Sequence, residues 1–168
     1  MSAETQGVET PLTKIDVPHG IRRANVRAMN LRPLICVAPD ATLAETLAQM
    51  KRAETDAVFV CDNGHVVGIV SSRDILARVT GGRLDVTKAA RDVMTKDFAQ
   101  LTNDATIGQV VETMNQRGVQ HVAISNNGDF TGAISDLDIV TFLVESYPKE
   151  TMNLPPVAKQ MMDTREGE

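Results

Sequence analysis

The chain contains an internal repeat. When the sequence is shifted by 64 positions, residues 40–76 align with residues 104–140 without a gap, and 11 of the 37 pairs are identical. Nine of the other 26 pairs match one apolar residue or glycine with another. A length of 168 residues allows one domain or two small ones, and the repeat favours two. We therefore divide the chain into an N-terminal arm (1–26), a first repeat (27–82), a second repeat (90–146) and a C-terminal tail (147–168).

Each repeat shows the same order of expected elements. A short apolar segment is followed by an amphipathic helix, because apolar residues recur at i, i+4 and i+7 from Leu43 and again from Ile107. Asp40 and Asp104 stand just ahead of these helices and are expected to cap them. The arm and the tail are polar and lack such a period, so we expect both to be flexible.

A hairpin and a second helix complete each repeat. Two β-rich runs are joined by Asn63-Gly64 and, in the second repeat, by Asn127-Gly128, which tolerate the positive φ of tight turns. Gly81-Gly82 ends the last helix of the first repeat, and Pro148 ends that of the second. The sequence therefore predicts an α/β (α+β) fold of two β-α-β-β-α units, related by a pseudo-two-fold axis, whose apolar sheet faces cover each other.

Composition excludes several classes of function. The formal net charge is −5 and aromatic residues make up 3%, which argues against a general nucleic-acid or anionic-membrane binder and against stacking platforms. The longest apolar runs fall short of the roughly 20 residues of a membrane helix. The first residues also lack a secretory signal pattern. We therefore expect a cytoplasmic protein that does not bind a membrane.

The motifs give no support to enzyme chemistry. The sequence has no nucleophile elbow, phosphate-binding loop, zinc-type histidine pair or Cys-x-x-Cys, so we expect no catalysis, no metal and no required cofactor. The two cysteines, Cys36 and Cys61, lie in apolar strand segments and are expected to be buried, inert thiols.

One short motif ends both hairpins: Gly, two apolar residues, Ser, two variable residues and Asp, at residues 68–74 and again at 132–138. One interpretation is a helix-capping box, since Ser-x-x-Asp before an apolar run satisfies free backbone N–H groups. The other is a ligand site, in which the helix start and the serine meet a phosphate while the aspartate accepts hydrogen bonds from both ribose hydroxyls. The appearance of the motif in both repeats favours the ligand site.

Together these features are similar to a tandem cystathionine-β-synthase (CBS) domain pair, or Bateman module. The resemblance covers roughly residues 27–146 and depends on the Asp-Ala-Thr helix starts, the Asn-Gly hairpins and the doubled Ser-x-x-Asp motif, in this order. It implies a regulatory module that binds adenosine-containing ligands, such as AMP, ADP, ATP or S-adenosylmethionine, in clefts between the repeats. It also implies a disc-shaped homodimer, held by the apolar faces of the repeat helices, and an effector protein that receives the signal.

The resemblance further implies the site residues. The ribose hydroxyls would be held by Asp74 and Asp138, with Ser71 and Ser135 near the phosphate. The base or the ribose would be bordered by the segments around four further residues: Val37, Leu101, Ala57 and His121. At residues 30–32 the chain has Asn-Leu-Arg where Thr-Lys-Asp is usual in the family, a change that we expect to lie away from the ligand contacts.

The two sites are expected to differ in charge. His121 would meet a phosphate when protonated, whereas its counterpart Ala57 follows Asp56, which would repel one. Asp136 opens the last helix of the second repeat with a negative charge, where Ser72-Arg73 stands in the first. These differences oppose each other, so the better site stays open. For His121, a structural role with a hydrogen bond to a neighbouring carbonyl is equally open.

Three alternatives stand beside a sensing function. The first is an interaction module with empty clefts. The second is the detached regulatory subunit of an enzyme, kinase or channel. The third is nucleic-acid binding through Arg22, Arg23, Arg27 and Arg32, which the net charge makes the least favoured. Otherwise these arginines form a solvated basic stretch, or reach an anionic ligand or the acidic surface of a partner chain.

Overall fold

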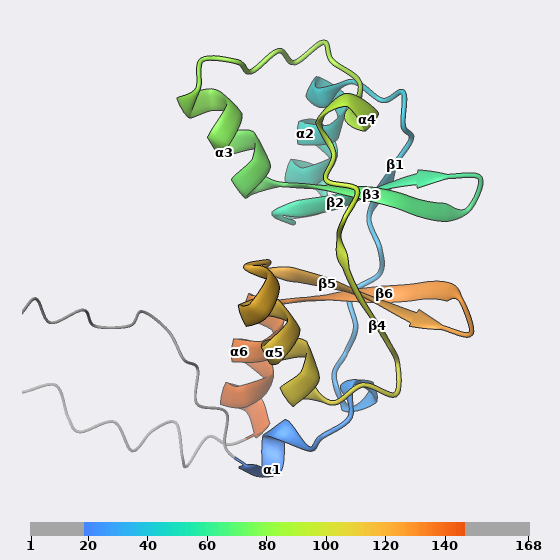
Figure 1. Ribbon diagram of the computed structural model, residues 1–168, viewed down its shortest axis with the longest axis vertical. Coiled ribbons are helices and arrows are strands. Elements are labelled where there is room, and N and C mark those ends of the chain that lie inside the picture. The colour runs from blue at the N-terminus through green and yellow to red at the C-terminus, as the bar shows by residue number, and fades with distance from the viewer. Residues whose placement is uncertain (1–18, 147–168) are drawn as a thin grey trace, which may run out of the picture.

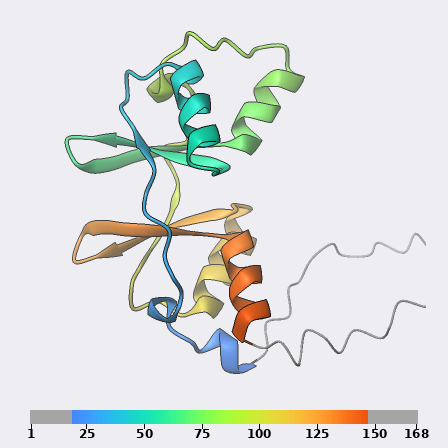
Figure 2. The same cartoon turned by 180° about the vertical axis from the view of Figure 1, so that it is seen from behind.

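The computed structural model describes residues 19–146, and Figures 1 and 2 show its two halves stacked one above the other. Residues 1–18 of the predicted arm and the whole of the predicted tail lie outside the described residues. The first repeat contains β1 (Cys36–Val37), α2 (Leu43–Arg52), β2 (Ala57–Asp62), β3 (His65–Ser71) and α3 (Ser72–Thr80). The second contains β4 (Ala99–Thr102), α5 (Ile107–Arg117), β5 (His121–Asn126), β6 (Asp129–Ser135) and α6 (Asp136–Ser146). Three short helical segments precede the strands of the repeats: α1 (His19–Arg22) and the 3-10 turn η1 (Val26–Ala28) before β1, and α4 (Ala90–Val93) before β4.

Both repeats have the predicted β-α-β-β-α order, so the α/β fold is confirmed. In each, a parallel strand pairs with the first strand of an antiparallel hairpin, in the orders β1-β2-β3 and β4-β5-β6. The hairpin turns fall where predicted: φ is 48° and 82° at Asn63-Gly64, and 51° and 90° at Asn127-Gly128. Two successive positive φ angles characterise the type I′ turn, whose twist matches that of the strands. Within residues 19–146, no helix has the length and apolar character needed to cross a membrane.

The caps of the first helices differ from the prediction. Thr42 is the N-cap residue of α2 and Thr106 that of α5, and each forms a capping box with the residue three positions on. The expectation that Asp40 and Asp104 cap these helices is wrong, because a capping side chain must come from the residue directly before the first turn. In α2, the backbone N–H and the hydroxyl of Thr42 both donate to Glu45 and lower the pKa of its carboxyl.

Three clusters of buried side chains hold the two repeats together. Each repeat packs its helices against one face of its own sheet, and the opposite faces of the two sheets meet in a central cluster. Phe59 and Ile69 of the first sheet pack there with Ala123 of the second. Phe98 lies between Phe59 and Phe130, at ring-centroid distances of 6.3 and 6.0 Å. The prediction that the sheets cover each other is therefore confirmed.

The segment ahead of the first strand of each repeat packs on the other repeat. Ile21, Val26 and Met29 are buried in the helix-side core of the second repeat, although the predicted arm extends to residue 26. In the same way, Ala90 and Val93 of α4 are buried in the core of the first repeat. The chain thus crosses between the halves twice, as the blue and yellow-green segments of Figure 1 show.

Two isolated β-bridges position these crossing segments. Arg32 pairs with Ala133 of β6, and Thr95 pairs with Ile69 of β3. The glycine of the repeated motif allows the close approach, because a Cβ on Gly132 would lie only 2.8 Å from the carbonyl oxygen of Arg32. The crossing therefore brings Arg32 beside the Ser-x-x-Asp motif of the second repeat and Thr95 beside that of the first.

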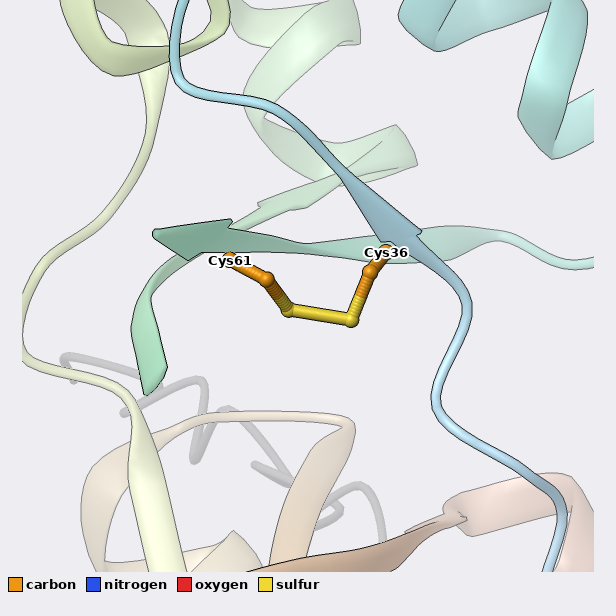
Figure 3. Close-up of a disulfide and its surroundings, with 2 residues drawn as sticks. All are labelled: Cys36 and Cys61. Atoms are coloured by element: carbon orange, nitrogen blue, oxygen red, sulfur yellow. A yellow bond between two sulfur atoms is a disulfide. The ribbon is translucent and has the colours of Figure 1, made fainter. Parts of the chain in front are cut away.

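The prediction of two buried, inert thiols is wrong. Cys36 in β1 and Cys61 in β2 form a disulfide with a Cα–Cα distance of 5.7 Å, which Figure 3 shows. Cys36 pairs with Phe59 across the two parallel strands, so Cys61 stands two residues further along the neighbouring strand. Cys36 is exposed and Cys61 only partly buried. Strand pairing creates this proximity, which the sequence separation of 25 residues conceals.

Reduction of this disulfide should lower the free energy of unfolding by about 3 kcal/mol, because cross-linking a loop of this length removes that much chain entropy from the unfolded state. Urea denaturation with and without dithiothreitol measures the difference. The Cys36→Ser/Cys61→Ser variant should match the reduced protein and should not respond to dithiothreitol. Equal stabilities of the oxidised and reduced wild-type protein would contradict the assignment.

Candidate functional site

Two clefts lie between the repeats, and each combines the Ser-x-x-Asp motif of one repeat with the hairpin start of the other. The larger has a volume of about 600 Å³ and the smaller of about 150 Å³. Small-molecule sites have volumes of roughly 300–1,000 Å³, so only the larger of these two clefts lies in that range. Its walls include apolar Ile35, Phe59 and Ala133 and polar Ser135 and Asp138.

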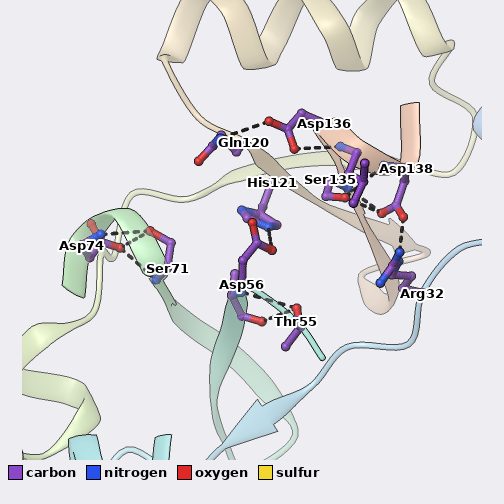
Figure 4. A network of polar contacts seen from close by, with 12 residues as sticks. Arg32, Thr55, Asp56, Ser71, Asp74, Gln120, His121, Ser135, Asp136 and Asp138 are labelled. Atoms are coloured by element: carbon purple, nitrogen blue, oxygen red, sulfur yellow. Dashed lines mark hydrogen bonds and ion pairs between the residues drawn. The ribbon is translucent and has the colours of Figure 1, made fainter. Parts of the chain in front are cut away.

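The two oxygens of Asp138 have different partners. Oδ2 accepts hydrogen bonds from the backbone N–H and the hydroxyl of Ser135, both at 2.8 Å. Oδ1 accepts a hydrogen bond from Nε of Arg32 at 2.6 Å, as Figure 4 shows. Asp138 is 13% exposed and Arg32 55% exposed, and both line the larger cleft. One carboxylate oxygen of Asp138 thus caps α6, and the other bonds Arg32 at the wall of the cleft. Because capping uses only one of the two oxygens, the capping and ligand interpretations are compatible.

The position of Arg32 corrects an expectation from the sequence. The departure from the family pattern at residues 30–32 was expected to lie away from the ligand contacts, and this is wrong. The β-bridge to Ala133 places Arg32 on the wall of the larger cleft, where its guanidinium bonds Asp138. The contact matches neither interpretation of the basic stretch, because the partner of Arg32 is a carboxylate of the same chain.

The smaller cleft repeats this geometry with a weaker partner. Oδ2 of Asp74 accepts hydrogen bonds from the backbone N–H of Ser71 at 3.0 Å and from its hydroxyl at 2.7 Å. Oδ1 of Asp74 is 3.5 Å from the hydroxyl of Thr95, which occupies the place of Arg32. Asp74 thus lacks the short charged contact that engages Asp138.

His121 connects the two halves and lines both clefts. Its Nε2 lies 2.8 Å from Oδ1 of Asp56, and the imidazole is only 9% exposed (Figure 4). The structural interpretation expected a neighbouring carbonyl as the partner of His121, and the partner is instead the carboxylate of the opposite repeat. This contact joins the start of β5 to the residue before β2, so a ligand in either cleft would lie against it.

The starts of the two last helices differ in charge. At α6, the carboxylate of Asp136 accepts a hydrogen bond from the N–H of Leu137 at 2.7 Å, and its other oxygen accepts one from the side chain of Gln120 at 3.1 Å. At α3 the corresponding positions are Ser72 and Arg73, and Arg73 lines the smaller cleft. A negative group already occupies the positive end of the α6 dipole, which makes α6 the poorer place for a phosphate.

Six of the eight predicted site residues line a cleft: Ala57, His121, Ser135 and Asp138 in the larger, and Ser71, Asp74 and again His121 in the smaller. Val37 and Leu101 line neither cleft, because they pack against the cores under the helices. Ile35 and Ala99, two positions earlier in the chain, line the clefts instead. The predicted segments thus border the clefts, but Val37 and Leu101 themselves do not line them.

A family model for the CBS domain matches residues 26–81 and 90–145. The chain belongs to the CBS domain family. A curated relative, an uncharacterized 17.7 kDa protein of Acidianus ambivalens, is 28% identical over 130 residues, which are 76% of each protein. Two further relatives, uncharacterized proteins of Methanocaldococcus jannaschii, are longer, and the chain spans 48% and 43% of them.

Solved structures of CBS proteins have the same fold. A CBS domain protein of Pyrobaculum aerophilum, solved in complex with AMP, superposes with a TM-score of 0.63 at 22% identity, covering 72% of this chain and 98% of that one. The CBS domain pair of protein MJ0100, solved with 5′-methylthioadenosine and S-adenosyl-L-methionine, gives a TM-score of 0.66 at 17% identity, covering 74% and 98%. At these identities the likeness establishes the fold alone.

Loss of the capping carboxylate should destabilise the protein even without a ligand. Asp138→Ala removes the acceptor for two hydrogen bonds of Ser135 and should lower the free energy of unfolding by about 1 kcal/mol, the usual value for a helix cap. The control is Thr141→Ala, at an exposed position of the same helix, which should change stability by less than about 0.5 kcal/mol. Urea denaturation of the ligand-free proteins measures both. An unchanged stability of Asp138→Ala would show that the box does not cap α6.

Proposed function

We propose that this CBS domain pair is a regulatory module that senses an adenosine-containing ligand, of the class of AMP, ADP, ATP or S-adenosylmethionine, and passes the signal to a partner protein. The larger cleft is the principal site. The module takes no part in catalysis, and any enzyme or channel that it regulates is the partner.

The observation that carries the proposal is the carboxylate of Asp138 at the wall of the larger cleft. Its Oδ1 has one partner, Arg32, and a carboxylate oxygen has room for a further hydrogen bond from a ribose hydroxyl. Ile35, Phe59 and Ala133 offer an apolar surface for a base in the same cleft. Support also comes from the two structural relatives, which were solved with AMP and with S-adenosyl-L-methionine.

The signal would arise because the larger cleft is shared between the repeats. Thr55, Asp56 and Ala57 come from the first repeat, whereas Ser135 and Asp138 come from the second. A ligand that contacts both sides favours the relative arrangement of the repeats in which those contacts are best. It can shift the equilibrium only by its difference in affinity between arrangements.

Isothermal titration of the full chain with AMP, ADP, ATP and S-adenosylmethionine tests the proposal. At least one should bind, and Asp138→Asn should weaken binding at the larger cleft by about 10–100-fold, since a hydrogen bond to a charged group contributes about 1.5–3 kcal/mol. The control is Asp129→Asn, an exposed residue at the start of β6. Absence of binding by all four compounds would reject the sensing function.

The second candidate function is an interaction module whose clefts stay empty. The capping boxes favour it, because the serine and aspartate of each motif already satisfy one another without a ligand. In that case the titrations would show no heat for any of the four compounds, and the Asp138→Asn variant would differ from wild type in stability alone.

We also propose a homodimer formed through α3 and α6. Leu76 of α3 is 63% exposed and Val144 of α6 is 52% exposed, in stripes of apolar residues that also include Val79 and Val140. Both helices lie on the same side of the molecule in Figures 1 and 2. Apolar stripes on neighbouring outer helices are typical of surfaces that a second copy covers.

Sedimentation velocity should therefore show a dimer of the wild-type chain and a monomer of the Leu76→Glu/Val144→Glu variant, because a buried, unpaired carboxylate on each stripe opposes association. Val86→Glu, at an exposed apolar residue outside both helices, should leave the dimer intact. A wild-type monomer, or a double variant that stays dimeric, would reject this interface.

A further inference from the structure

A third pocket, of about 290 Å³, adjoins the smaller cleft and shares Asp74 and Thr95 with it. The pocket lies between α3 and the chain segment that starts at Val93. Its two basic residues are Arg78, on the turn of α3 that follows Asp74, and Arg83, in the loop after that helix. Two guanidinium groups thus stand next to the proposed ribose acceptor of the smaller cleft.

The backbone positions both arginines. Arg78 is partly buried and donates a hydrogen bond from Nη2 to the carbonyl of Val93 at 3.2 Å. The backbone N–H of Arg83 donates to the carbonyl of Arg78 at 2.9 Å. The side chain of Arg83 folds back toward the end of α3, since its Nε would lie 3.3 Å from a Cβ on Gly81. Both arginines therefore line the same pocket.

The described residues leave most of the donors of these arginines unused. Between residues 19 and 146, the ion pairs involve other side chains, and neither Arg78 nor Arg83 meets a carboxylate within 4.0 Å. A guanidinium carries five N–H donors in a planar fork that matches the oxygens of a phosphate. Two such groups around one pocket, in a chain of net charge −5, mark a site for an anion.

The second repeat carries no arginine at the position equivalent to Arg78. Phe142 stands 64 positions after Arg78 and packs into the core of the second repeat. The larger cleft carries two carboxylates from the segment after α2, Glu54 and Asp56, beside the basic side chains of Arg32 and His121. The clefts therefore differ in charge, because the pocket beside the smaller one holds two arginines without a carboxylate partner among the described residues, whereas Arg32 of the larger one is paired with Asp138.

We propose that Arg78 and Arg83 form a phosphate subsite that receives the phosphate groups of a nucleotide whose ribose is held by Asp74. The inference rests on the proposed function and refines it. The smaller cleft, extended by this pocket, selects phosphorylated adenosine compounds. The larger cleft, with Glu54 and Asp56 on its wall, favours adenosine compounds without a polyphosphate.

Titration of the full chain with adenosine and with ADP tests this selection, in an Asp138→Ala background that disables the larger cleft. ADP should bind at least tenfold more tightly than adenosine, and Arg83→Ala should remove most of that advantage while leaving adenosine unchanged. Arg78→Lys, which keeps the charge but not the fork, should have a smaller effect. The matched control is Arg52→Ala, the same charge change at an exposed residue of α2 outside all three pockets.

A second measurement does not depend on the ribose site. Pyrophosphate alone should show 31P line broadening with the wild-type chain and with Arg52→Ala, and about tenfold weaker binding to Arg83→Ala. If pyrophosphate binds in this way while adenosine and ADP do not, the subsite stands and the proposed function fails. If Arg83→Ala changes neither pyrophosphate nor ADP binding, or weakens adenosine as much as ADP, the subsite is rejected.

Discussion

The two small sheets depend on each other for burial. A three-stranded sheet with helices on one face leaves its other face open, and here each open face is covered by the sheet of the other repeat. Phe59, Phe98 and Phe130 form the centre of that contact, with Phe98 between the other two rings. Neither repeat could keep this apolar surface from water alone, which is why the repeats act as one unit.

The clefts are the edges of this same contact. Phe59 and Ala133 take part in the contact between the sheets and also line the larger cleft, while Ile69 and Phe98 do the same for the smaller one. A ligand in a cleft would therefore touch the surfaces that hold the repeats together. This gives the proposed sensing function its physical basis, since a change in how the two sheets meet alters both the cleft and the outer helices.

The two repeats form two clefts with the same Ser-x-x-Asp geometry but different volume and charge. The bridge that places Arg32 beside Asp138 places Thr95 beside Asp74, and one exchange of an arginine for a threonine separates the electrostatics of the two carboxylates. The disulfide adds a second difference, because Cys61 aligns with Ser125 in the second repeat and only the first sheet is cross-linked. The repeated motif defines the scaffold, and the residues around it distinguish the sites.

The sequence alone was sufficient for the repeat, the order of its elements and the hairpin turns, because these depend on local periodicity and on the positive φ of Asn63 and Gly64. It also predicted the capping boxes of Asp74 and Asp138, whose spacing from a serine is a local property of a helix start. The same reasoning could have predicted Thr42 and Thr106 as the helix caps, but it selected Asp40 and Asp104, two residues earlier.

Only the tertiary structure shows which residues far apart in the sequence contact each other. The contacts of Arg32 with Asp138, of His121 with Asp56 and of Cys36 with Cys61 span 106, 65 and 25 residues. No pattern along the chain specifies such pairs, because they depend on which strand edge each segment crosses and on how the two sheets face each other.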